Sequence, residues 1–413
     1  MANGYLTQKQ GLKTFAKDCG RFAEGKTADF IYASSFYQAV RSDLAKDLVE
    51  WSNKDVVIRL ENSKEILVKE QISPTTVEDY YKCPYRSFLS HGLRLKEREE
   101  GSVDVLSVGN LMHEIFSIYA KEMDKVTDLE SSNTLFESAK DQVVQREEFS
   151  RYLLDGRNNA TVNRVLDECK KYCYKTYLSL ANSDYSVKTT EASFGDGKFY
   201  PAIKLLGGKV KIKGKIDRVD ESQNYFRVID YKTGSTDATD KGLFSGTKLQ
   251  LFLYAKAVAE KYKDSKNIAG LYYLPVSDKY QKEDEELSPM ADGRTLQDQN
   301  AILEQDNTFF DKGVSQFLPN KLDAKGNVKN ALSKDALDSY VDYAVQISEL
   351  AVKQMQDGSI VASPYGPSCE YCQFKGLCND QDRHVREIGP VKEETITKAL
   401  LDQTTDEGEI SND

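Results

Sequence analysis

The chain has 413 residues, of which 39% are hydrophobic and 30% are charged, and its formal net charge is −10. This composition is typical of a globular protein with a substantial core, built as one large or two modest domains. The acidic balance excludes a protein that coats nucleic acid by bulk charge, so any nucleic-acid contact must be a local basic strip. The sequence has no run of about 18 apolar residues and no apolar signal-peptide core, which predicts a cytoplasmic protein without a membrane partner.

Residues 1–70 are predicted to form an N-terminal helical segment, as at the end of a preceding domain. Residues 20–27 read GRFAEGKT and satisfy the pattern of a phosphate-binding loop. Such a loop must follow a buried strand, whereas residues 13–22 have the pattern of a polar amphipathic helix, so we interpret the match as coincidence. Helical spacing of apolar residues at 33–51 and a short strand at 56–60 are also expected.

Residues 71–385 are predicted to form one domain that begins with a helix. Ser73 is a suitable N-cap for this helix and Pro74 suits its first position. Cys83 and an aromatic-rich stretch follow. A second helix is expected around His113, because the neighbouring apolar residues have core spacing and the histidine projects from the edge of that apolar face.

Further along the chain, residues 128–184 have a helical and heavily charged pattern. A strand at 189–194 would bring Glu191 close to a cleft, and we assign it no role. A buried strand is expected at 268–276. Residues 277–326 are polar and are expected to leave the core as an excursion with some helix.

The most informative stretch lies between residues 209 and 254. A strand is predicted at 209–217, where side chains alternate between a core face and a charged face. A second strand at 226–232 would pair with it as a hairpin. The charged face offers a candidate strip for contact with DNA, made of Lys209, Lys211, Lys213 and Lys215.

A symmetrical turn predicts the register of this hairpin. The pairing that places Asp220 opposite Arg227 also places Asp217 opposite Asp230, with Cβ atoms roughly 5 Å apart. Like charges in such a pair destabilise a sheet by up to about 1 kcal/mol. We therefore expect a divalent cation with oxygen ligands between the two carboxylates.

Lys232 lies on the same face of the second strand as Asp230, so its ammonium group would lie beside the cation. A lysine there can orient an attacking water and offset charge on a scissile phosphate, as in metal-assisted phosphodiester hydrolysis. Gln250 and Tyr254 are four residues apart in a helical pattern, which places them on one face. That face could cover the site.

These motifs resemble those of a nuclease family. G-x-I-D-R-x-D from residue 214, the thirteen-residue step from Asp217 to Asp230, I-D-Y-K-T-G and Q-L-x-L-Y are similar to the RecB-type nucleases of the PD-(D/E)xK superfamily. The resemblance implies an α/β fold with an αβββαβ core, in which helices flank a mixed central sheet and helical insertions are added.

The resemblance also implies roles for individual residues. A Mg²⁺ or Mn²⁺ ion would be held by four groups, and Lys232 would position the attacking water and stabilise the transition state. Gln250 and Tyr254 would orient Lys232, the substrate or solvent. The implied metal ligands are His113, Asp217, Asp230 and the carbonyl of Tyr231.

A second pattern lies near the C-terminus, where Cys369, Cys372 and Cys378 occur within ten residues. With Cys83 they supply four thiolates, enough for zinc or for a 4Fe–4S cluster, and spacing alone leaves both open. The odd total of seven cysteines favours intracellular metal binding over a disulfide framework. Residues 386–413 are acidic and are predicted to be disordered.

Residues 73–382 resemble the nuclease domain of AddB and RexB subunits of bacterial helicase-nucleases. This resemblance implies an iron–sulfur clasp that joins the N- and C-terminal parts of the domain. It also implies a Mg²⁺- or Mn²⁺-dependent deoxyribonuclease, an exonuclease acting on single-stranded DNA or DNA ends in double-strand break repair. A helicase partner of AddA or RexA type is implied as well, because the sequence has no convincing ATPase motif.

Two alternatives stay open. One is a free-standing RecB-like exonuclease of phage or CRISPR-adaptation type. The other is a catalytically silent scaffold that binds DNA ends, against which the intact Asp217, Asp230 and Lys232 count.

Overall fold

The computed structural model describes residues 66–67, 69–95, 105–146, 149, 156–232, 239–276, 290–370, 372–375, 378 and 385–400. The elements expected at 33–51 and 56–60 and the loop-like pattern at 20–27 lie outside the described residues. The chain divides into two compact units. The smaller comprises Met1–Leu67, Asp79–Glu97 and Lys353–Glu387, and the larger comprises Val68–Glu78, Arg98–Val352 and Ile388–Asp413.

The larger unit is built on a mixed sheet. Over the described residues this sheet has six strands in the order β2-β5-β6-β7-β8-β9. Strand β6 pairs with β7, and β8 with β9, in parallel, while the other neighbouring pairs are antiparallel. The strands are β2 (Ser186–Phe194), β5 (Gly214–Glu221), β6 (Tyr225–Lys232), β7 (Asn267–Pro275), β8 (Asp292–Leu296) and β9 (Ala331–Leu332).

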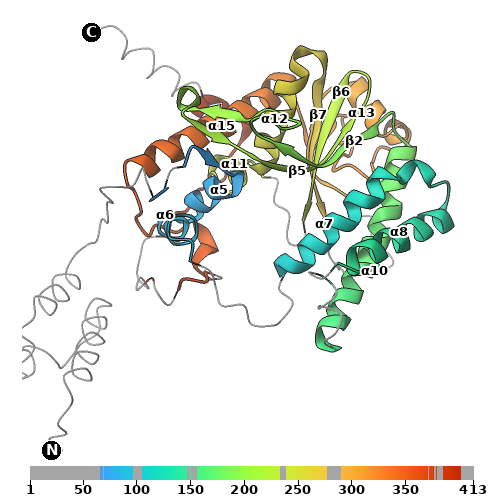
Figure 1. Ribbon diagram of the computed structural model, residues 1–413. Helices are drawn as coiled ribbons and strands as arrows, with labels where there is room; N and C mark the ends of the chain where they lie inside the picture. The colour runs from blue at the N-terminus through green and yellow to red at the C-terminus, as the bar shows by residue number, and fades with distance from the viewer. Residues whose placement is uncertain are drawn as a thin grey trace, which may run out of the picture. The chain divides into compact units, whose positions relative to one another are not determined.

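Helices cover both faces of this sheet (Figure 1). One face carries α7 (Val105–Lys121), α8 (Leu129–Val144) and α10 (Gly156–Ala181), and the other carries α12 (Gln250–Tyr262). The apolar sides of α7, α8 and α10 share a core with inward-facing residues of β6 and β7. The order α7, β2, β5, β6, α12, β7 is the predicted αβββαβ core, so that prediction is confirmed.

The remaining elements are shorter or lie outside this core. Helix α5 begins at Pro74, and the Thr76 amide donates to the Ser73 hydroxyl at 3.2 Å, so the predicted cap is confirmed. The others are α5 (Pro74–Lys82), α6 (Pro84–Ser87), η1 (Phe88–Gly92), η2 (Met123–Lys125), η4 (Leu206–Gly208), α11 (Asp240–Phe244), η5 (Lys263–Ser265), α13 (Gln299–Gln305), α14 (Phe309–Lys312), α15 (Lys334–Gln356) and η6 (Gly366–Cys369).

The strand predicted at 209–217 is wrong as a single element. Its first part is β4 (Val210–Ile212), which belongs to a small sheet with β1 (Gln71–Ile72) and β3 (Ile203–Leu205). The Lys211 and Lys213 amides donate to the carbonyls of Glu70 and Ile72, at 2.9 Å each, whereas β5 pairs with β2 and β6. Alternation of apolar residues continues through both strands and does not reveal the change of partner.

Two other predictions are corrected. The excursion expected at 277–326 contains β8, which pairs with β7 and extends the central sheet. Residues 393–400, placed in a disordered tail, are helical, and Ile396 is fully buried. Residues 401–413 lie outside the described part of the chain.

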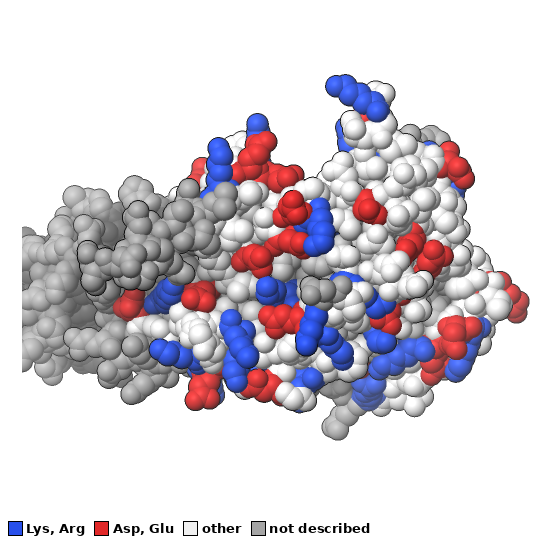
Figure 2. Space-filling view, turned by 90° about the horizontal axis from the view of Figure 1, so that it is seen from above, with Lys and Arg blue, Asp and Glu red and all other residues white. Residues whose placement is uncertain are grey.

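The described surface carries mixed charge. Figure 2 shows lysine and arginine side chains interspersed with aspartate and glutamate side chains over one face. Within the described ranges, no helix is both long and apolar enough to cross a membrane.

Candidate metal centre

Three carboxylates lie in a row across β2, β5 and β6. Asp220 pairs with Arg227, as predicted, and the ladder continues for two more pairs. One further step in the same register places Asp217 opposite Asp230. On the other side of β5, the pairs that flank Glu191 place it opposite Asp217. The sheet therefore gathers three acidic side chains at one level.

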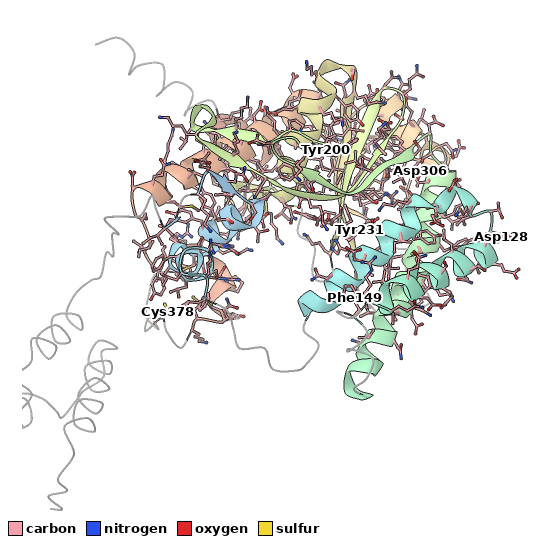
Figure 3. All side chains as sticks on the ribbon, viewed as in Figure 1. Asp128, Phe149, Tyr200, Tyr231, Asp306 and Cys378 are labelled. Atoms are coloured by element: carbon pink, nitrogen blue, oxygen red, sulfur yellow. The ribbon has the colours of Figure 1, made fainter. Side chains whose placement is uncertain are left out.

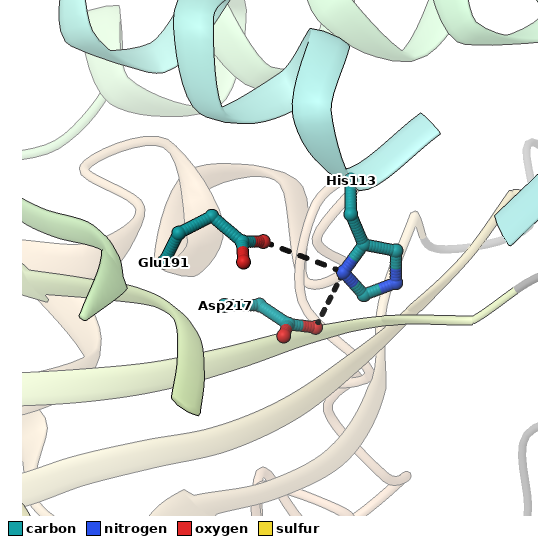
Figure 4. Close-up of side chains that lie close together, drawn as sticks. All are labelled: His113, Glu191 and Asp217. Carbon is teal, nitrogen blue, oxygen red and sulfur yellow. Dashed lines mark ion pairs between the residues drawn. The ribbon is translucent and has the colours of Figure 1, made fainter. Parts of the chain in front are cut away.

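His113 reaches this row from α7 (Figure 4). Its Nδ1 lies 3.3 Å from Asp217 Oδ2 and 3.5 Å from Glu191 Oε1, and its Nε2 lies 3.1 Å from the carbonyl oxygen of Tyr231. Burial would lower the pKa of His113, but the hydrogen bonds and charges of the two carboxylates raise it to about 10. Without a cation, His113 is thus an imidazolium that offsets part of the acidic charge.

Glu191 has an unusual backbone for a residue inside a strand. Its φ of +52° lies in the left-handed region, which costs a residue with a side chain roughly 1–2 kcal/mol. Its carboxylate forms ion pairs with His113 and Lys215. Burial would raise the pKa of Glu191, but these two cations lower it below its usual range. Strain at a charged cluster indicates a functional constraint.

The sequence placed Glu191 near a cleft but gave it no role. The missing information was the pairing of β2 with β5, because only that register sets Glu191 opposite Asp217. Strand patterns reveal which face a residue occupies, but not which strand becomes its neighbour.

Asp230 is fully buried. Its Oδ2 lies 2.5 Å from Lys232 Nζ in an ion pair, and neither of its oxygens has a hydrogen-bond partner in complete geometry among the described residues. Burial and the charge of Asp217 raise the pKa of Asp230 to about 7. A buried carboxylate in this state lacks the ligands that would satisfy its lone pairs.

Lys232 is held by residues of α12. Its ammonium donates to Gln250 Oε1 at 2.9 Å, and Gln250 Nε2 donates to the Tyr254 hydroxyl at 2.5 Å. Burial would lower the pKa of Lys232, but Asp230 and Asp217 raise it above its usual range. Lys232 therefore stays cationic at neutral pH, and the structure brings it together with Gln250 and Tyr254 as the helical spacing predicted.

Tyr231 faces away from Lys232, toward α7 (Figure 3). Its ring stacks on Phe116 with centroids 4.6 Å apart and belongs to the core between the sheet and α7. Because successive strand residues point to opposite faces, burial of Tyr231 on one face helps to fix Lys232 on the other.

Gly214, the first residue of the G-x-I-D motif, is required by packing. A Cβ atom there would lie 2.7 Å from Cε1 of Phe194. The Phe194 ring meets the Tyr254 ring edge-on, with centroids 5.7 Å apart. The missing side chain thus allows Phe194 to support the residue that binds Gln250.

The R-x-D part of the motif forms a buried ion triad. Arg218 donates to Asp220 at 2.6 and 2.7 Å, and Arg227 Nε donates to the same carboxylate at 2.9 Å. Burial would raise the pKa of Asp220, but the two guanidinium groups lower it. Removing one partner from such a buried set is costly, so the triad fixes β5 against β6 beside Asp217.

The residues of this site fit a hard divalent cation. Ligand atoms of His113, Glu191 and Asp217 all lie within 4.8 Å of one another. Glu191 Oε1 and both Asp230 oxygens are buried without a hydrogen-bond partner among the described residues. Carboxylate oxygens with one imidazole suit Mg²⁺ or Mn²⁺.

Comparison with known proteins agrees with this site. The family model described as the PD-(D/E)XK nuclease superfamily matches residues 71–379. The chain belongs to this superfamily. The match spans both units and includes every residue of the metal site, so the αβββαβ core and the I-D-Y-K stretch are those of a PD-(D/E)XK protein.

Relatives of this PD-(D/E)XK chain are named as one of the subunits of an ATP-dependent helicase/deoxyribonuclease, the AddB-like one. The protein of Thermoanaerobacter sp. (strain X514) is 26% identical over 391 residues, which cover 83% of this chain and 33% of the relative. That of Clostridioides difficile (strain 630) is 25% identical over 401 residues, covering 84% and 34%. The chain thus spans about a third of the length of these relatives.

The lysine strip expected on the PD-(D/E)XK core is not one face of a strand. Lys211 lies on β4 and forms an ion pair with Asp196 at 2.7 Å, whereas Lys215 lies on β5 and pairs with Glu191. Lys209 and Lys213 lie outside both strands. A role of these four lysines in DNA binding stays a prediction.

In the smaller unit, the four predicted cysteines meet. Cys83, Cys369, Cys372 and Cys378 line one cavity of about 510 Å³, to which Arg86 and Lys375 also contribute. Burial and the neighbouring thiols of Cys83 and Cys372 raise the pKa of Cys369. Four thiols around one cavity suit a thiolate-bound metal or cluster.

Proposed function

We propose that the chain is a metal-dependent deoxyribonuclease that hydrolyses phosphodiester bonds in single-stranded DNA or at DNA ends. The observation that supports this best is the cluster of His113, Glu191 and Asp217 beside the ion pair of Asp230 with Lys232. Membership of the nuclease superfamily and the names of the relatives agree with it.

In this proposal the chain holds one Mg²⁺ or Mn²⁺ ion through His113, Asp217, Asp230 and the carbonyl of Tyr231, with Glu191 as an additional carboxylate. The Tyr231 carbonyl accepts a hydrogen bond from His113 Nε2 in the metal-free arrangement, so it also orients the imidazole. When bound, the cation supplies a Lewis acid that offsets charge developing on the phosphate.

Lys232 supplies a fixed positive charge to the reacting phosphate. Because its pKa is raised, it acts as a cation and hydrogen-bond donor rather than as a base. It orients the attacking water, whose oxygen forms a bond to phosphorus as the bond to the leaving oxygen breaks. Gln250 and Tyr254 hold the ammonium group in place, which removes the cost of ordering it during the reaction.

For the smaller unit we propose a 4Fe–4S cluster bound by Cys83, Cys369, Cys372 and Cys378. The cavity that these thiols line supports a metal or cluster, and the resemblance to AddB-type nucleases favours iron and sulfur over zinc. The cluster is proposed to be structural, as a clasp between segments of chain far apart in sequence.

The proposed context is the nuclease part of an AddAB/RexAB-type helicase-nuclease in double-strand break repair. The names of the relatives include both a helicase and a deoxyribonuclease, and the helicase would be a partner protein of AddA or RexA type. Co-purification with a helicase would separate this from a free-standing exonuclease of phage or CRISPR-adaptation type.

The test is cleavage of end-labelled single-stranded DNA by the purified chain with Mn²⁺. We expect cleavage by wild type and a loss of at least about 100-fold in Asp230→Ala and Lys232→Ala, with DNA affinity largely kept because the phosphate grip is shared with other cations. Lys334→Ala, at an exposed side chain of α15, is the control and should cleave normally. Ca²⁺ should support binding without turnover, because its looser geometry holds the nucleophile less well.

Three results would contradict the proposal. Wild type that binds DNA ends with Mn²⁺ but never cleaves them would favour the silent scaffold. Equal losses of binding and cleavage in folded Asp230→Ala would argue against its assigned role, and rapid cleavage in Ca²⁺ would argue against the metal chemistry.

A further inference from the structure

Helix α12, which carries Gln250 and Tyr254, has no cap of its own. The residue at its N-cap position is Leu249, whose side chain makes no capping hydrogen bond, and the first turn of the helix has no acidic residue. Helices leave their first N–H groups without an internal acceptor. The start of α12 is buried at Leu249, so water cannot serve that amide freely.

Glu78, in α5, supplies the missing acceptor. Its Oε1 accepts hydrogen bonds from the backbone amides of Leu249 at 2.7 Å and of Gln250 at 2.9 Å. The Glu78 side chain is itself buried, with 7% of its surface exposed. A charged acceptor that binds two amides is a strong anchor, and its negative charge suits the positive end of a helix.

This anchor lies one residue away from the catalytic lysine in the chain of hydrogen bonds. Glu78 holds the backbone of Gln250, and the side chain of Gln250 accepts from Lys232 at 2.9 Å. Because Gln250 is the first residue of α12, nothing else in the first turn of the helix fixes its amide. The position of Lys232 Nζ therefore depends on Glu78 through a single intermediate.

We propose that Glu78 is a positioning residue of the nuclease site, which sets the ammonium group of Lys232 by anchoring Gln250. This rests on the role of Lys232 under the proposed function. Glu78 does not contact the phosphate or the cation; it acts through Gln250. Loss of the anchor lets Lys232 move, and displacement of a catalytic group by about 1 Å can cost on the order of 100-fold in rate.

The experiment measures single-turnover cleavage of single-stranded DNA by the full chain with saturating Mn²⁺. Glu78→Ala should lose about 10- to 100-fold in rate at saturating DNA, with the DNA dissociation constant within about twofold of wild type. Glu78→Gln keeps the reach of the acceptor and should recover to within about threefold to fivefold of wild type. Glu78→Asp keeps the charge but withdraws the acceptor, so it should resemble Glu78→Ala.

A double-mutant cycle tests the route through Gln250. Once Gln250→Ala has removed the link, adding Glu78→Ala should lower the rate by less than about threefold further. Asp298→Ala is the matched control, because Asp298 caps α13 by accepting from the Ala301 amide at 2.8 Å. It removes a part-buried helix cap without touching the site, so it should lower the melting temperature and leave the cleavage rate unchanged.

Two results would overturn the proposal. One is a rate for Glu78→Ala within about threefold of wild type in a folded protein, and the other is losses that multiply in the double variant. If Glu78→Ala fails to fold, equal rates for Glu78→Gln and Glu78→Asp overturn it instead.

A second measurement separates this proposal from the nuclease assignment. The ¹³Cε resonance of Lys232, identified by its loss in Lys232→Arg, should move in Glu78→Ala and stay in place in Asp298→Ala. This holds even if wild type cleaves nothing, in which case the proposed function fails while the positioning role is still decided. An unmoved Lys232 resonance in Glu78→Ala would overturn the positioning role.

Discussion

Glu191 Oε1 lies 3.5 Å from His113 Nδ1, and this contact comes from a strand residue whose φ is +52°. A strand that kept its regular conformation through Glu191 would avoid this backbone cost, so the contact and the distortion belong together. Stability is lost locally in order to place a carboxylate beside the imidazole.

Glycine at position 191 should separate these two effects. Glu191→Gly and Glu191→Ala both remove the carboxylate, so both should weaken Mn²⁺ binding at least about tenfold by calorimetry. In the absence of metal, Glu191→Gly should be at least as stable as Glu191→Ala, because glycine adopts positive φ without steric cost. Urea unfolding measures this. Ala192→Gly, at the next strand position, is the control and should lose about 0.5–1 kcal/mol.

Mn²⁺ affinity should rise with pH. The pKa of His113 is raised to about 10 and that of Asp230 to about 7 in the metal-free site, and a ligand must lose its proton to bind the cation. The affinity should increase up to about tenfold per pH unit for each proton released. Titrations at pH 6.5 and 8.5 in buffers of different ionisation enthalpy count these protons, and a pH-independent affinity would contradict the prediction.

Asp230→Asn should stabilise the metal-free protein at alkaline pH. The pKa of Asp230 is raised to about 7 in the folded state and is near 3.9 when unfolded, so the folded state holds the proton more tightly. Stability then falls as pH rises between these values. We expect Asp230→Asn to exceed wild type by about 1–4 kcal/mol at pH 8 with EDTA, and to match it near pH 4.

Asp196→Asn, at an exposed carboxylate paired with Lys211, is the control for this comparison and should show little change. Addition of Mn²⁺ should stabilise wild type more than Asp230→Asn. A variant less stable than wild type at pH 8 without metal would show that burial of the Asp230 charge does not destabilise the fold.

Cys372→Ala should remove the cluster and lower the melting temperature. A link from Cys83 to Cys369 closes a loop of roughly 290 residues, worth on the order of 5–6 kcal/mol if the expression for disulfides applies. Wild type should be brown, with broad absorption near roughly 400 nm, and the variant colourless with weaker DNA binding. Mn²⁺ affinity should persist, because the carboxylate row is set by the sheet.

Cys173→Ala is the matched control, because Cys173 is fully buried in the core of the larger unit. It should lower the melting temperature without bleaching the protein. One zinc and no iron in anaerobically prepared wild type would refute the cluster, and unchanged melting and DNA binding in Cys372→Ala would refute the clasp.

Gly214→Ala should slow cleavage from a distance. Its Cβ would displace Phe194, which supports Tyr254 and through it Gln250 and Lys232. We expect a loss of about 10-fold or more in rate, with Mn²⁺ affinity kept. Gly389→Ala is the control, since no atom lies within 4 Å of a Cβ there. Equal rates for the two variants would mean that Phe194 relaxes freely.

Local pattern and register were readable from the sequence. Asp217 and Asp230 follow from one hairpin, whose short turn and alternation leave little freedom in pairing. Gln250 and Tyr254 follow from helical spacing over four residues. In each case the residues that meet are close in the chain, so geometry within one motif was enough.

What could not be read depends on contacts between segments far apart in the chain. Glu191 joins the site through the pairing of β2 with β5, and Glu78 reaches α12 from 171 residues upstream. The switch of partner between β4 and β5 has the same origin. Such contacts are set by the packing of whole elements, which hydrophobic periodicity does not encode.

The smaller unit is assembled from segments that the ribosome makes at different times. Cys83 emerges early, while Cys369, Cys372 and Cys378 follow only after the whole central sheet has been synthesised. At about 5–20 residues per second, Cys83 waits roughly 15–60 s for its partners. During that interval its thiol has no completed cavity around it. Delivery of iron and sulfur must therefore come late, on a chain whose larger unit already has most of its strands.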